Sequence, residues 1–300
     1  MNYRDLFLCL ALLVSVSSCE IINPSEEIPA YISVKNPVVV LDEGTGFSTN
    51  VGLRNIWLYH GGELQGTYQF DPAVDTVGRV FPILNLDKYE FFIDPGIYET
   101  GQSAFQIPYP FWDRLTFRWE ANPLDTLELT PEFHYIDPAL YETPVDEHFE
   151  GGNIGMDPFA TGLNSTEACS FVIDNNDVFQ ETGSGKVVFD ATHRWFEVIS
   201  SVPFITTAAD NIFAEVTYKS NIPFTIGLIY QTSTTVNGVI VLSVNPSGNW
   251  NTVYVHMISE VRDILNTVGA NTIFNLWLKA DGENKDGYIL FDDIRVIKEK

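Results

Sequence analysis

Residues 287–296, GYILFDDIRV, decide the fold of the C-terminal half of this 300-residue chain. A run of aromatic and aliphatic residues is followed by two adjacent acids and then by Ile294 and Val296. The apolar residues do not recur at helical spacing, so this pattern predicts a strand. Runs of the same kind precede it, at FTIGLIY (224–230), VNGVIVLSV (236–244), TVYVHM (252–257) and TIFNLWLKA (272–280). In the second run we expect Asn237-Gly238 to form a hairpin turn.

One segment of the C-terminal half departs from this pattern. In residues 259–268, Val261, Ile264, Leu265 and Val268 recur at the spacing of one helical face. This segment therefore predicts a short surface helix.

The N-terminal half, from residue 30 to about residue 135, is a series of short apolar or alternating runs separated by Gly, Pro, Asn and Asp. The stretch LTFRWE (115–120) alternates apolar and polar residues, as a strand with one buried face does. HGG (60–62) is predicted to turn the chain between two strands. No run is long enough at helical spacing to indicate a helix.

These patterns predict an all-β protein of two β-sandwich domains. A small immunoglobulin-like sandwich is expected over residues 30–135. A C-terminal jelly roll with one short helix is expected over residues 147–300. Between them, residues 136–146 are rich in Pro and acids and are predicted to be a linker.

Four strings narrow the fold of the C-terminal domain. It opens with HFEGG (148–152), continues with TGSGKVVF (182–189) and GNWNTVYVHM (248–257), and closes with YILFDDIRV (288–296). Together they resemble the galactose-binding-like jelly roll, the scaffold of many carbohydrate-binding modules. The resemblance implies the framework of the fold rather than a particular ligand.

The same resemblance implies one metal ion. In that family a carboxylate at the start of the domain and one on its last strand often share a structural calcium. Glu150 and Asp292 stand in these positions, and Asp177 could add a third side chain, with backbone carbonyls completing the oxygen shell. The alternative is that these acids are solvated strand ends. If the ion is bound, we expect it to brace the sandwich and to take no part in a reaction.

The N-terminal residues are predicted to be an export signal. Arg4 precedes an apolar segment of signal-peptide length, which ends in VSSC (16–19). VSSC resembles the lipobox of bacterial lipoproteins, which implies that residues 1–18 are removed and that Cys19 is lipidated. Residues 19–29 form an acidic tether, similar to the surface-export signals of Bacteroidota lipoproteins. We therefore expect a lipid anchor in the outer membrane and exposure at the cell surface, with the periplasmic face as the alternative.

Composition excludes several functions. With 16 basic and 40 acidic residues, the formal net charge is -24, which repels nucleic acid and anionic headgroups. Cys169 is the one cysteine beyond the N-terminal segment, so no disulfide framework is possible. The five histidines lack the spacing of a metal site, and no catalytic constellation stands out. We therefore expect a protein that is not an enzyme.

Aromatic residues are the strongest candidates for binding. Tyr109, Phe111 and Trp112 lie among prolines, which prevent a regular central strand. Exposed on a loop, they would suit a sugar face or a protein hot spot. The alternative is that this segment folds back and caps the first sandwich. In the C-terminal half the candidates are Trp195 and its neighbour His193.

Two functions follow from these observations. In the first, the protein is an accessory subunit that docks on an outer-membrane protein complex. In the second, it is a surface lipoprotein whose jelly roll binds a glycan. A planar aromatic shelf beside polar groups would favour the glycan, whereas a broad apolar patch with a polar rim would favour a protein partner.

Overall fold

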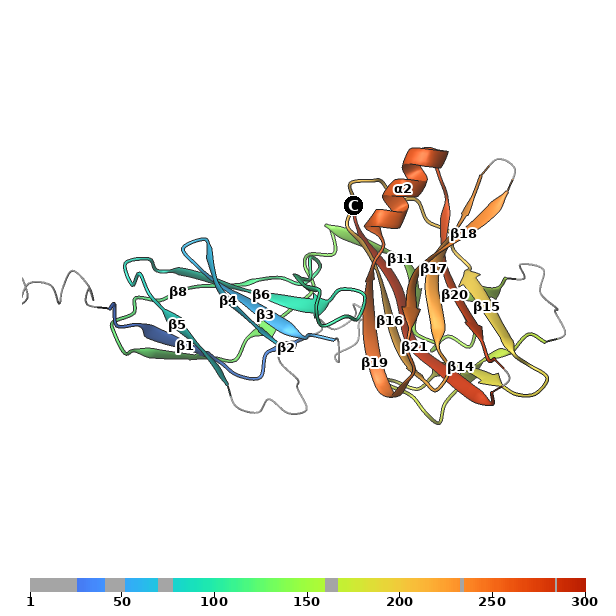
Figure 1. Ribbon diagram of the computed structural model, residues 1–300, viewed down its shortest axis with the longest axis horizontal. Coiled ribbons are helices and arrows are strands. Elements are labelled where there is room, and N and C mark those ends of the chain that lie inside the picture. The colour runs from blue at the N-terminus through green and yellow to red at the C-terminus, as the bar shows by residue number, and fades with distance from the viewer. Residues whose placement is uncertain (1–25, 41–51, 70–77, 160–166, 233–234, 284) are drawn as a thin grey trace, which may run out of the picture.

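The computed structural model describes residues 26–40, 52–69, 78–159, 167–232, 235–283 and 285–300. Cys19, the predicted signal peptide and most of the predicted tether lie outside these residues. Two β-sandwiches lie side by side along the long axis of the molecule (Figure 1). In the part of the chain that is described, no helix is both long enough and apolar enough to cross a bilayer.

The N-terminal sandwich packs two layers of short strands around one core. In one layer β1 pairs antiparallel with β5 and parallel with β9, and β2 pairs parallel with β10. In the other, β3 and β6 are neighbours, with β4 beside β3 and both β7 and β8 beside β6. The strands are β1 (Ala30–Val34), β2 (Val38–Val39), β3 (Asn55–His60), β4 (Glu63–Gln69), β5 (Arg79–Ile83), β6 (Glu90–Tyr98), β7 (Gln106–Pro108), β8 (Leu115–Arg118), β9 (Thr126–Leu129) and β10 (Glu132–Phe133).

The predicted turn at HGG is confirmed. It joins β3 to β4 through Gly61 and Gly62, whose φ angles are 55° and 85°. Two consecutive positive φ values make the two-residue turn that suits the twist of a hairpin, and glycine adopts them without steric cost.

The C-terminal sandwich consists of two antiparallel sheets. The near sheet, which lies next to the N-terminal sandwich, has the order β13-β14-β21-β16-β19, with β11 also beside β21 (Figure 1). The far sheet has the order β12-β15-β20-β17-β18. The elements are β11 (Tyr141–Glu147), β12 (Met156–Pro158), β13 (Phe171–Asp174), β14 (Ser184–Phe189), β15 (Trp195–Ser200), β16 (Ile212–Ser220), β17 (Phe224–Gln231), β18 (Val236–Val244), β19 (Ser247–His256), α2 (Ile258–Val268), β20 (Phe274–Asp281) and β21 (Gly287–Glu299).

The predicted all-β class, with a jelly roll, is confirmed, and the residues that the structure describes contain one short helix, as predicted. In α2, Val261, Ile264 and Leu265 are buried, as the helical spacing predicts, whereas Val268 at the end of the helix is exposed. Because side chains alternate across a strand, every second residue of each sheet enters the core, such as Phe196 of β15 and Val216 of β16. Full burial of such a side chain stabilises the fold by roughly 1.5–3 kcal/mol.

The two acids of GYILFDDIRV lie at a bulge in β21. Between its pairings with β16 at Phe291 and Ile294, β21 places two residues, Asp292 and Asp293, opposite Thr217. The extra residue keeps Phe291 and Ile294 both in the core and leaves both carboxylates outside it.

The segment expected to be a linker, 136–146, differs from that expectation. It contributes most of β11, in which Tyr141 and Val145 are buried against β21. Pro144 has no N–H to donate, and it falls where the pairing shifts register between Glu142 and Val145. The near sheet therefore begins inside this segment.

The predicted turn at Asn237-Gly238 is wrong. Both residues lie inside β18, paired with Tyr230 and Ile229 of β17, and the chain turns before Val236. An Asn-Gly pair favours a turn locally, but here the glycine meets a packing requirement of the sheet, described below.

Candidate functional site

The outer face of the far sheet carries two tryptophans. On β15, Phe196 and Val198 enter the core, so Trp195 and Glu197 lie on the opposite side. The register of β15 with β20 places Glu197 opposite Lys279, and Ile199 opposite the second tryptophan, Trp277. Figure 1 shows β15 and β20 on the side of the C-terminal sandwich away from the N-terminal one.

One carboxylate holds both tryptophans. The indole Nε1 of Trp195 donates to Oε2 of Glu197 at 3.1 Å, and that of Trp277 donates to Oε1 at 2.9 Å. Glu197 is only 6% exposed, so the acceptor is largely removed from water. A charged acceptor strengthens both hydrogen bonds, and the two rings are fixed relative to each other.

A lysine lies over the same rings. The ammonium of Lys279 is 4.5 Å from the centroid of the Trp195 ring and 5.5 Å from that of Trp277. This is cation–π distance, and Lys279 also brings a positive charge to the strand position opposite Glu197. We call Trp195, Glu197, Trp277 and Lys279 the tryptophan cluster.

Two glycines make room for the buried ring of the cluster. A Cβ on Gly227 would lie 2.9 Å from Cε3 of Trp277, and one on Gly238 would lie 3.1 Å from Cζ3. Trp277, at 7% exposure, therefore lies against the backbone of β17 and β18. This contact explains why Gly238 is a strand residue and not part of a turn.

A hollow of about 640 Å³ adjoins Trp195 at the edge of the far sheet. Its lining is mainly apolar and includes Ile154, Met156, Phe171 and Cys169. Burial, with a contribution from Asp190, raises the pKa of the Cys169 thiol to about 12, so it is protonated at neutral pH and is a poor nucleophile. Binding, rather than nucleophilic chemistry, fits this hollow.

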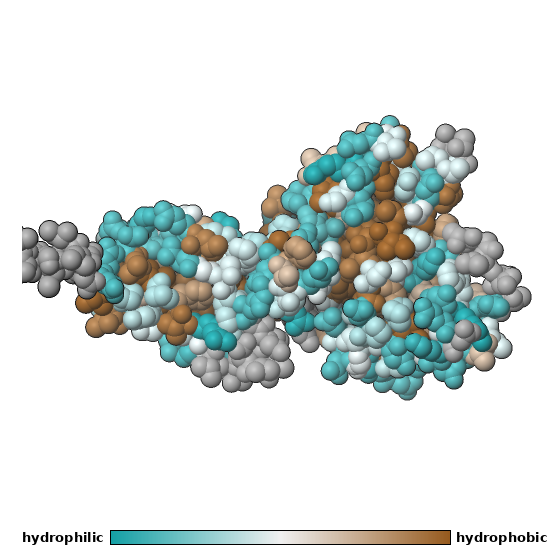
Figure 2. Space-filling model, viewed as in Figure 1, coloured by the Kyte–Doolittle hydropathy of each residue, from teal (hydrophilic) through white to brown (hydrophobic). Residues whose placement is uncertain are grey.

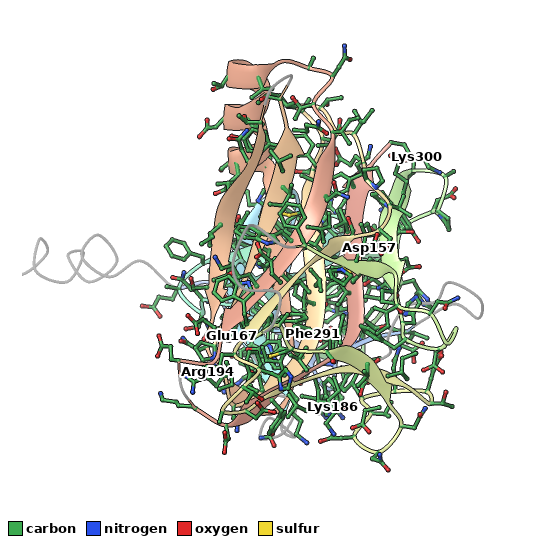
Figure 3. The ribbon with its side chains drawn as sticks, turned by 90° about the vertical axis from the view of Figure 1, so that its right-hand side faces the viewer. Asp157, Glu167, Lys186, Arg194, Phe291 and Lys300 are labelled. Carbon is green, nitrogen blue, oxygen red and sulfur yellow. The ribbon has the colours of Figure 1, made fainter. Side chains whose placement is uncertain are left out.

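His193 does not join the tryptophan cluster. Its ring Nδ1 lies 3.0 Å from a carboxylate oxygen of Asp190, within the turn that leads into β15. Figure 3 shows the next residue, Arg194, beside Glu167, whose backbone carbonyl accepts its N–H at 2.8 Å. Of the two candidates in the C-terminal half, His193 and Trp195, only Trp195 lies with the other residues of the tryptophan cluster.

The expectation of an exposed aromatic loop at 109–112 is wrong. Tyr109, Phe111 and Trp112 are 2%, 0% and 4% exposed. The ring of Tyr109 packs edge-on against Phe213 and Tyr254 of the near sheet, at 5.2 and 5.0 Å between centroids. The segment is buried because it lies between the two sandwiches, where the second sandwich covers it.

A buried ion pair lies beside these rings. The hydroxyl of Tyr109 donates to Glu215, and Nη1 of Arg295 lies 3.2 Å from the same carboxylate. Burial raises the pKa of Glu215, while Arg295 acts in the opposite direction. Nε of Arg295 also binds Asp146 at 2.9 Å. These groups form the seam between the sandwiches.

Two of the three predicted calcium ligands come together. Asp292 accepts the backbone N–H groups of Phe179 and Gln180, and Glu150 accepts those of Thr182 and Gly183, so one loop binds both. Burial and the charges of Asp293 and Glu150 raise the pKa of Asp292 to about 7, against its backbone hydrogen bonds. Such carboxylate crowding suits a hard cation.

Asp177 lies apart from this pair in its contacts. Its carboxylate binds the ammonium of Lys219 at 2.6 Å and accepts from Nε1 of Trp250 at 3.2 Å. No group of three or more His, Cys, Asp or Glu side chains among the described residues is arranged to hold a metal ion. Calcium at Glu150 and Asp292 therefore stays a prediction and would depend on carbonyl ligands.

The tryptophan cluster was only partly predicted. Trp195 was a candidate, but Glu197, Trp277 and Lys279 were not. The sequence contained a signal for the cluster. In W-x-E on β15 and W-x-K on β20, the tryptophan and the charged residue are two positions apart, so they lie on the same face of their strand. The register that joins them depends on the pairing of strands about 80 residues apart.

No family model and no curated protein matches the sequence. Solved structures similar to it include the family 11 carbohydrate-binding module of Clostridium thermocellum, with a mixed-linked tetrasaccharide, at 14% identity and TM-score 0.35 over 52% of this chain and 95% of the other. Another is the CBM22-1 xylan-binding domain of Paenibacillus barcinonensis, at 10% identity and TM-score 0.34 over 53% and 96%. A third holds the CBM22-1 and GH10 modules of a C. thermocellum xylanase. It has 13% sequence identity and a TM-score of 0.35 over 52% of this chain and 28% of that chain.

Proposed function

We propose that the protein is a non-catalytic glycan-binding lipoprotein that holds a saccharide chain on the outer face of its far sheet. The observation that carries the proposal is the tryptophan cluster, in which one buried carboxylate fixes two indole rings and a lysine lies over them. The partly exposed ring of Trp195, beside a lysine, is the kind of aromatic surface next to a polar group that favours a glycan.

The chemistry of a sugar suits this cluster. One face of a pyranose ring presents C–H groups, which pack on an indole, and its rim presents hydroxyls, which exchange hydrogen bonds with charged side chains. Lys279 can donate to a sugar hydroxyl, while the largely buried Glu197 holds the indole rings in place. Because the rings are already fixed, binding costs little side-chain entropy.

The test is direct binding to oligosaccharides. The intact protein is titrated calorimetrically with xylohexaose, mannohexaose and cellohexaose, beside Trp195→Ala. We expect the substitution to weaken binding of the preferred sugar at the cluster at least tenfold, about 1.4 kcal/mol, because it removes the partly exposed ring. Phe105→Ala, which removes a 56% exposed aromatic ring from the N-terminal sandwich, is the control and should bind like wild type. Equal binding by Trp195→Ala and wild type would refute the proposal.

We further propose that the protein acts at the cell surface, anchored in the outer membrane through Cys19. Support comes from the VSSC string and the acidic tether in the sequence. An anchored protein would hold a captured polysaccharide close to the membrane. Its charge of -24 favours neutral over acidic glycans.

The accessory-subunit function is the second candidate. Ile205 and Ile273 favour it, since they are 56% and 47% exposed and flank the bridge between Phe204 and Phe274. Figure 2 also shows apolar surface on the C-terminal sandwich below the helix. Purification from mild detergent extracts should recover an integral outer-membrane protein in stoichiometric amount if this function holds.

A further inference from the structure

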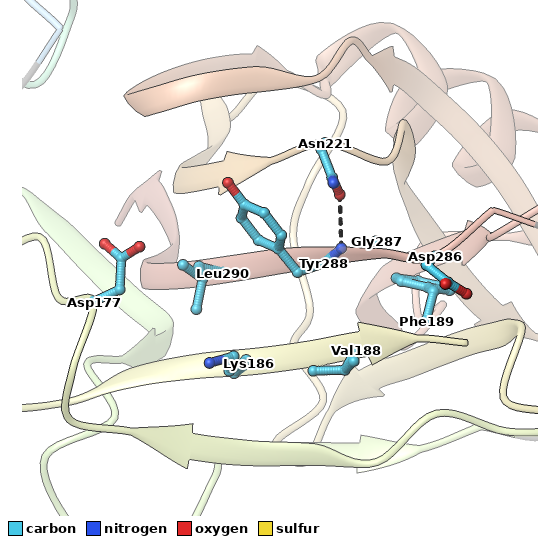
Figure 4. A pocket seen from close by; sticks show the side chains of 9 residues that line it. All are labelled: Asp177, Lys186, Val188, Phe189, Asn221, Asp286, Gly287, Tyr288 and Leu290. Carbon is cyan, nitrogen blue, oxygen red and sulfur yellow. Dashed lines mark hydrogen bonds between the residues drawn. The ribbon is translucent and has the colours of Figure 1, made fainter.

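The outer face of the near sheet is covered by the N-terminal sandwich over only part of its length. Along β21, Arg295 and Ile297 lie in the seam, whereas Tyr288 and Leu290 at the other end of the strand line a groove of about 550 Å³ (Figure 4). This groove lies on the opposite side of the sandwich core from the tryptophan cluster. It is thus separate from the site proposed above.

Three adjacent strands build the floor of the groove. Val188 of β14 pairs with Tyr288 of β21, and Lys186 of β14 pairs with Leu290. On the other side of β21, Lys219 of β16 also pairs with Leu290. An aromatic ring and two aliphatic side chains are therefore flanked on both sides by lysines.

The charges at the rim are already paired. Lys186 binds Asp174 at 2.9 Å, and Lys219 binds Asp177 at 2.6 Å. Each ammonium has three N–H donors and each carboxylate several lone pairs, so both pairs retain capacity for a further partner. Because each lysine is matched by an acid, the rim offers donors and acceptors without a strong net charge.

An amide adds a third polar group. The side-chain oxygen of Asn221 accepts the backbone N–H of Tyr288 at 2.7 Å, which fixes the amide beside the ring (Figure 4). Its NH₂ group carries two further donors. Asp286, at the end of the groove, adds an exposed acceptor.

We propose that this groove is a second saccharide site, for a neutral glycan. The partly exposed ring of Tyr288 and the 49% exposed Val188 would meet the C–H face of a sugar, while the paired charges and Asn221 would meet its hydroxyls. An anionic ligand would be repelled by the carboxylates of Asp177 and Asp286, which line the groove. An extended peptide would gain more from a free strand edge, which this groove in the middle of a sheet does not offer.

The class of ligand, a glycan, rests on the proposed function, whereas the position of the second site rests on the groove itself. With one site on each side of the sandwich, a single chain would bind two glycan strands. A chain that binds two strands of one polysaccharide at once would have an overall affinity higher than that of either site alone.

The experiment counts bound sugars. The intact protein is titrated calorimetrically with xylohexaose, mannohexaose and cellohexaose, and the stoichiometry is measured for wild type, Tyr288→Ala and Val188→Arg. Val188→Arg fills the groove from an exposed position, so it tests the site even if Tyr288→Ala fails to fold. Val80→Arg, at a 55% exposed strand position of the N-terminal sandwich, is the matched control.

We expect about two sugars per chain for wild type and for Val80→Arg, and one for Val188→Arg, for Tyr288→Ala and for Trp195→Ala. A stoichiometry unchanged by both groove variants would overturn the second site. Loss of all binding in Trp195→Ala would overturn it too, while leaving the proposed function intact. Binding that only the groove variants remove would instead overturn the tryptophan cluster as a site. Failure of all three sugars to bind would overturn both.

Discussion

His148 is held between two acids at the end of the seam. Its Nε2 lies 3.1 Å from Asp146, and its Nδ1 lies 2.7 Å from Asp293. These hydrogen bonds raise the pKa of His148 to about 10, although burial acts against them. A histidine whose pKa is raised on folding contributes stability that is complete below its unfolded pKa, near 6.5, and is lost as the pH rises through about 10.

We therefore expect His148→Gln to be less stable than wild type by about 1–2 kcal/mol at pH 6, allowing for partial exposure of the ring, and equally stable near pH 10. Urea unfolding across this range measures the difference. His193→Gln is the control, because that side chain is 48% exposed and its ion pair with Asp190 lies at the surface. A deficit of the same size at every pH would contradict the assigned role of the charge.

Glu150 and Asp292 test the calcium prediction. If a calcium ion binds there, it offsets the burial and the charges of Asp293 and Glu150 that raise the pKa of Asp292, and it stabilises the folded state by mass action. We expect the thermal midpoint at pH 7.5 to be several degrees higher in millimolar calcium than in EDTA, and Glu150→Gln to reduce the rise. Identical midpoints in calcium and EDTA would contradict the prediction.

At the scale of the element, the far sheet is built around Trp277. A Cβ on Gly227 would lie 2.3 Å from the carbonyl oxygen of Val239 as well as close to this ring. We expect Gly227→Ala to destabilise the protein by about 1–3 kcal/mol and to displace the Trp277 ring. The backbone carbonyl of Val239 is held in the sheet and cannot move aside as the end of a flexible side chain can. Gly248→Ala, whose Cβ meets nothing within 4 Å, should change stability by less than about 0.5 kcal/mol. Equal stability of the two variants in urea would show that the contact is unimportant.

Elements were predicted well where the signal was local. The spacing of Val261, Ile264 and Leu265 gave α2, and two glycines at 61–62 gave a hairpin. Asn237-Gly238 misled because the ring that requires a glycine there lies about 40 residues further on. For the same reason, Glu197 was missed, since only strand register brings its two indole partners together.

At the scale of the molecule, the seam joins two sandwiches through shared side chains. Tyr109 packs on Phe213 and donates to Glu215, and Arg54 donates to Asn251 at 2.9 Å. The sequence predicted burial of 109–112 as one alternative, but the surface that covers it belongs to the other sandwich. Local pattern carries no information about such a docked surface.

We expect the two sandwiches to unfold together in wild type and separately in Tyr109→Ala. The substitution leaves Glu215 and Arg295 with a cavity beside them, at a cost of about 3–5 kcal/mol. Calorimetry should show one transition for wild type and two for the variant. Tyr89→Ala, at a 38% exposed position, is the control and should keep one transition. Two transitions in wild type would contradict a cooperative seam.

The glycan-binding account is tested most directly by the indole N–H signals of the six tryptophans, recorded by NMR on protein with ¹⁵N-labelled tryptophan during addition of xylohexaose, mannohexaose or cellohexaose. Both indoles of the tryptophan cluster donate to Glu197, so a bound sugar must disturb their signals. The account predicts that one of these sugars shifts the Trp195 and Trp277 signals in a saturable way and leaves Trp57 and Trp119 unchanged. Signals of Trp195 and Trp277 that stay fixed at saturating concentrations of all three sugars would contradict it.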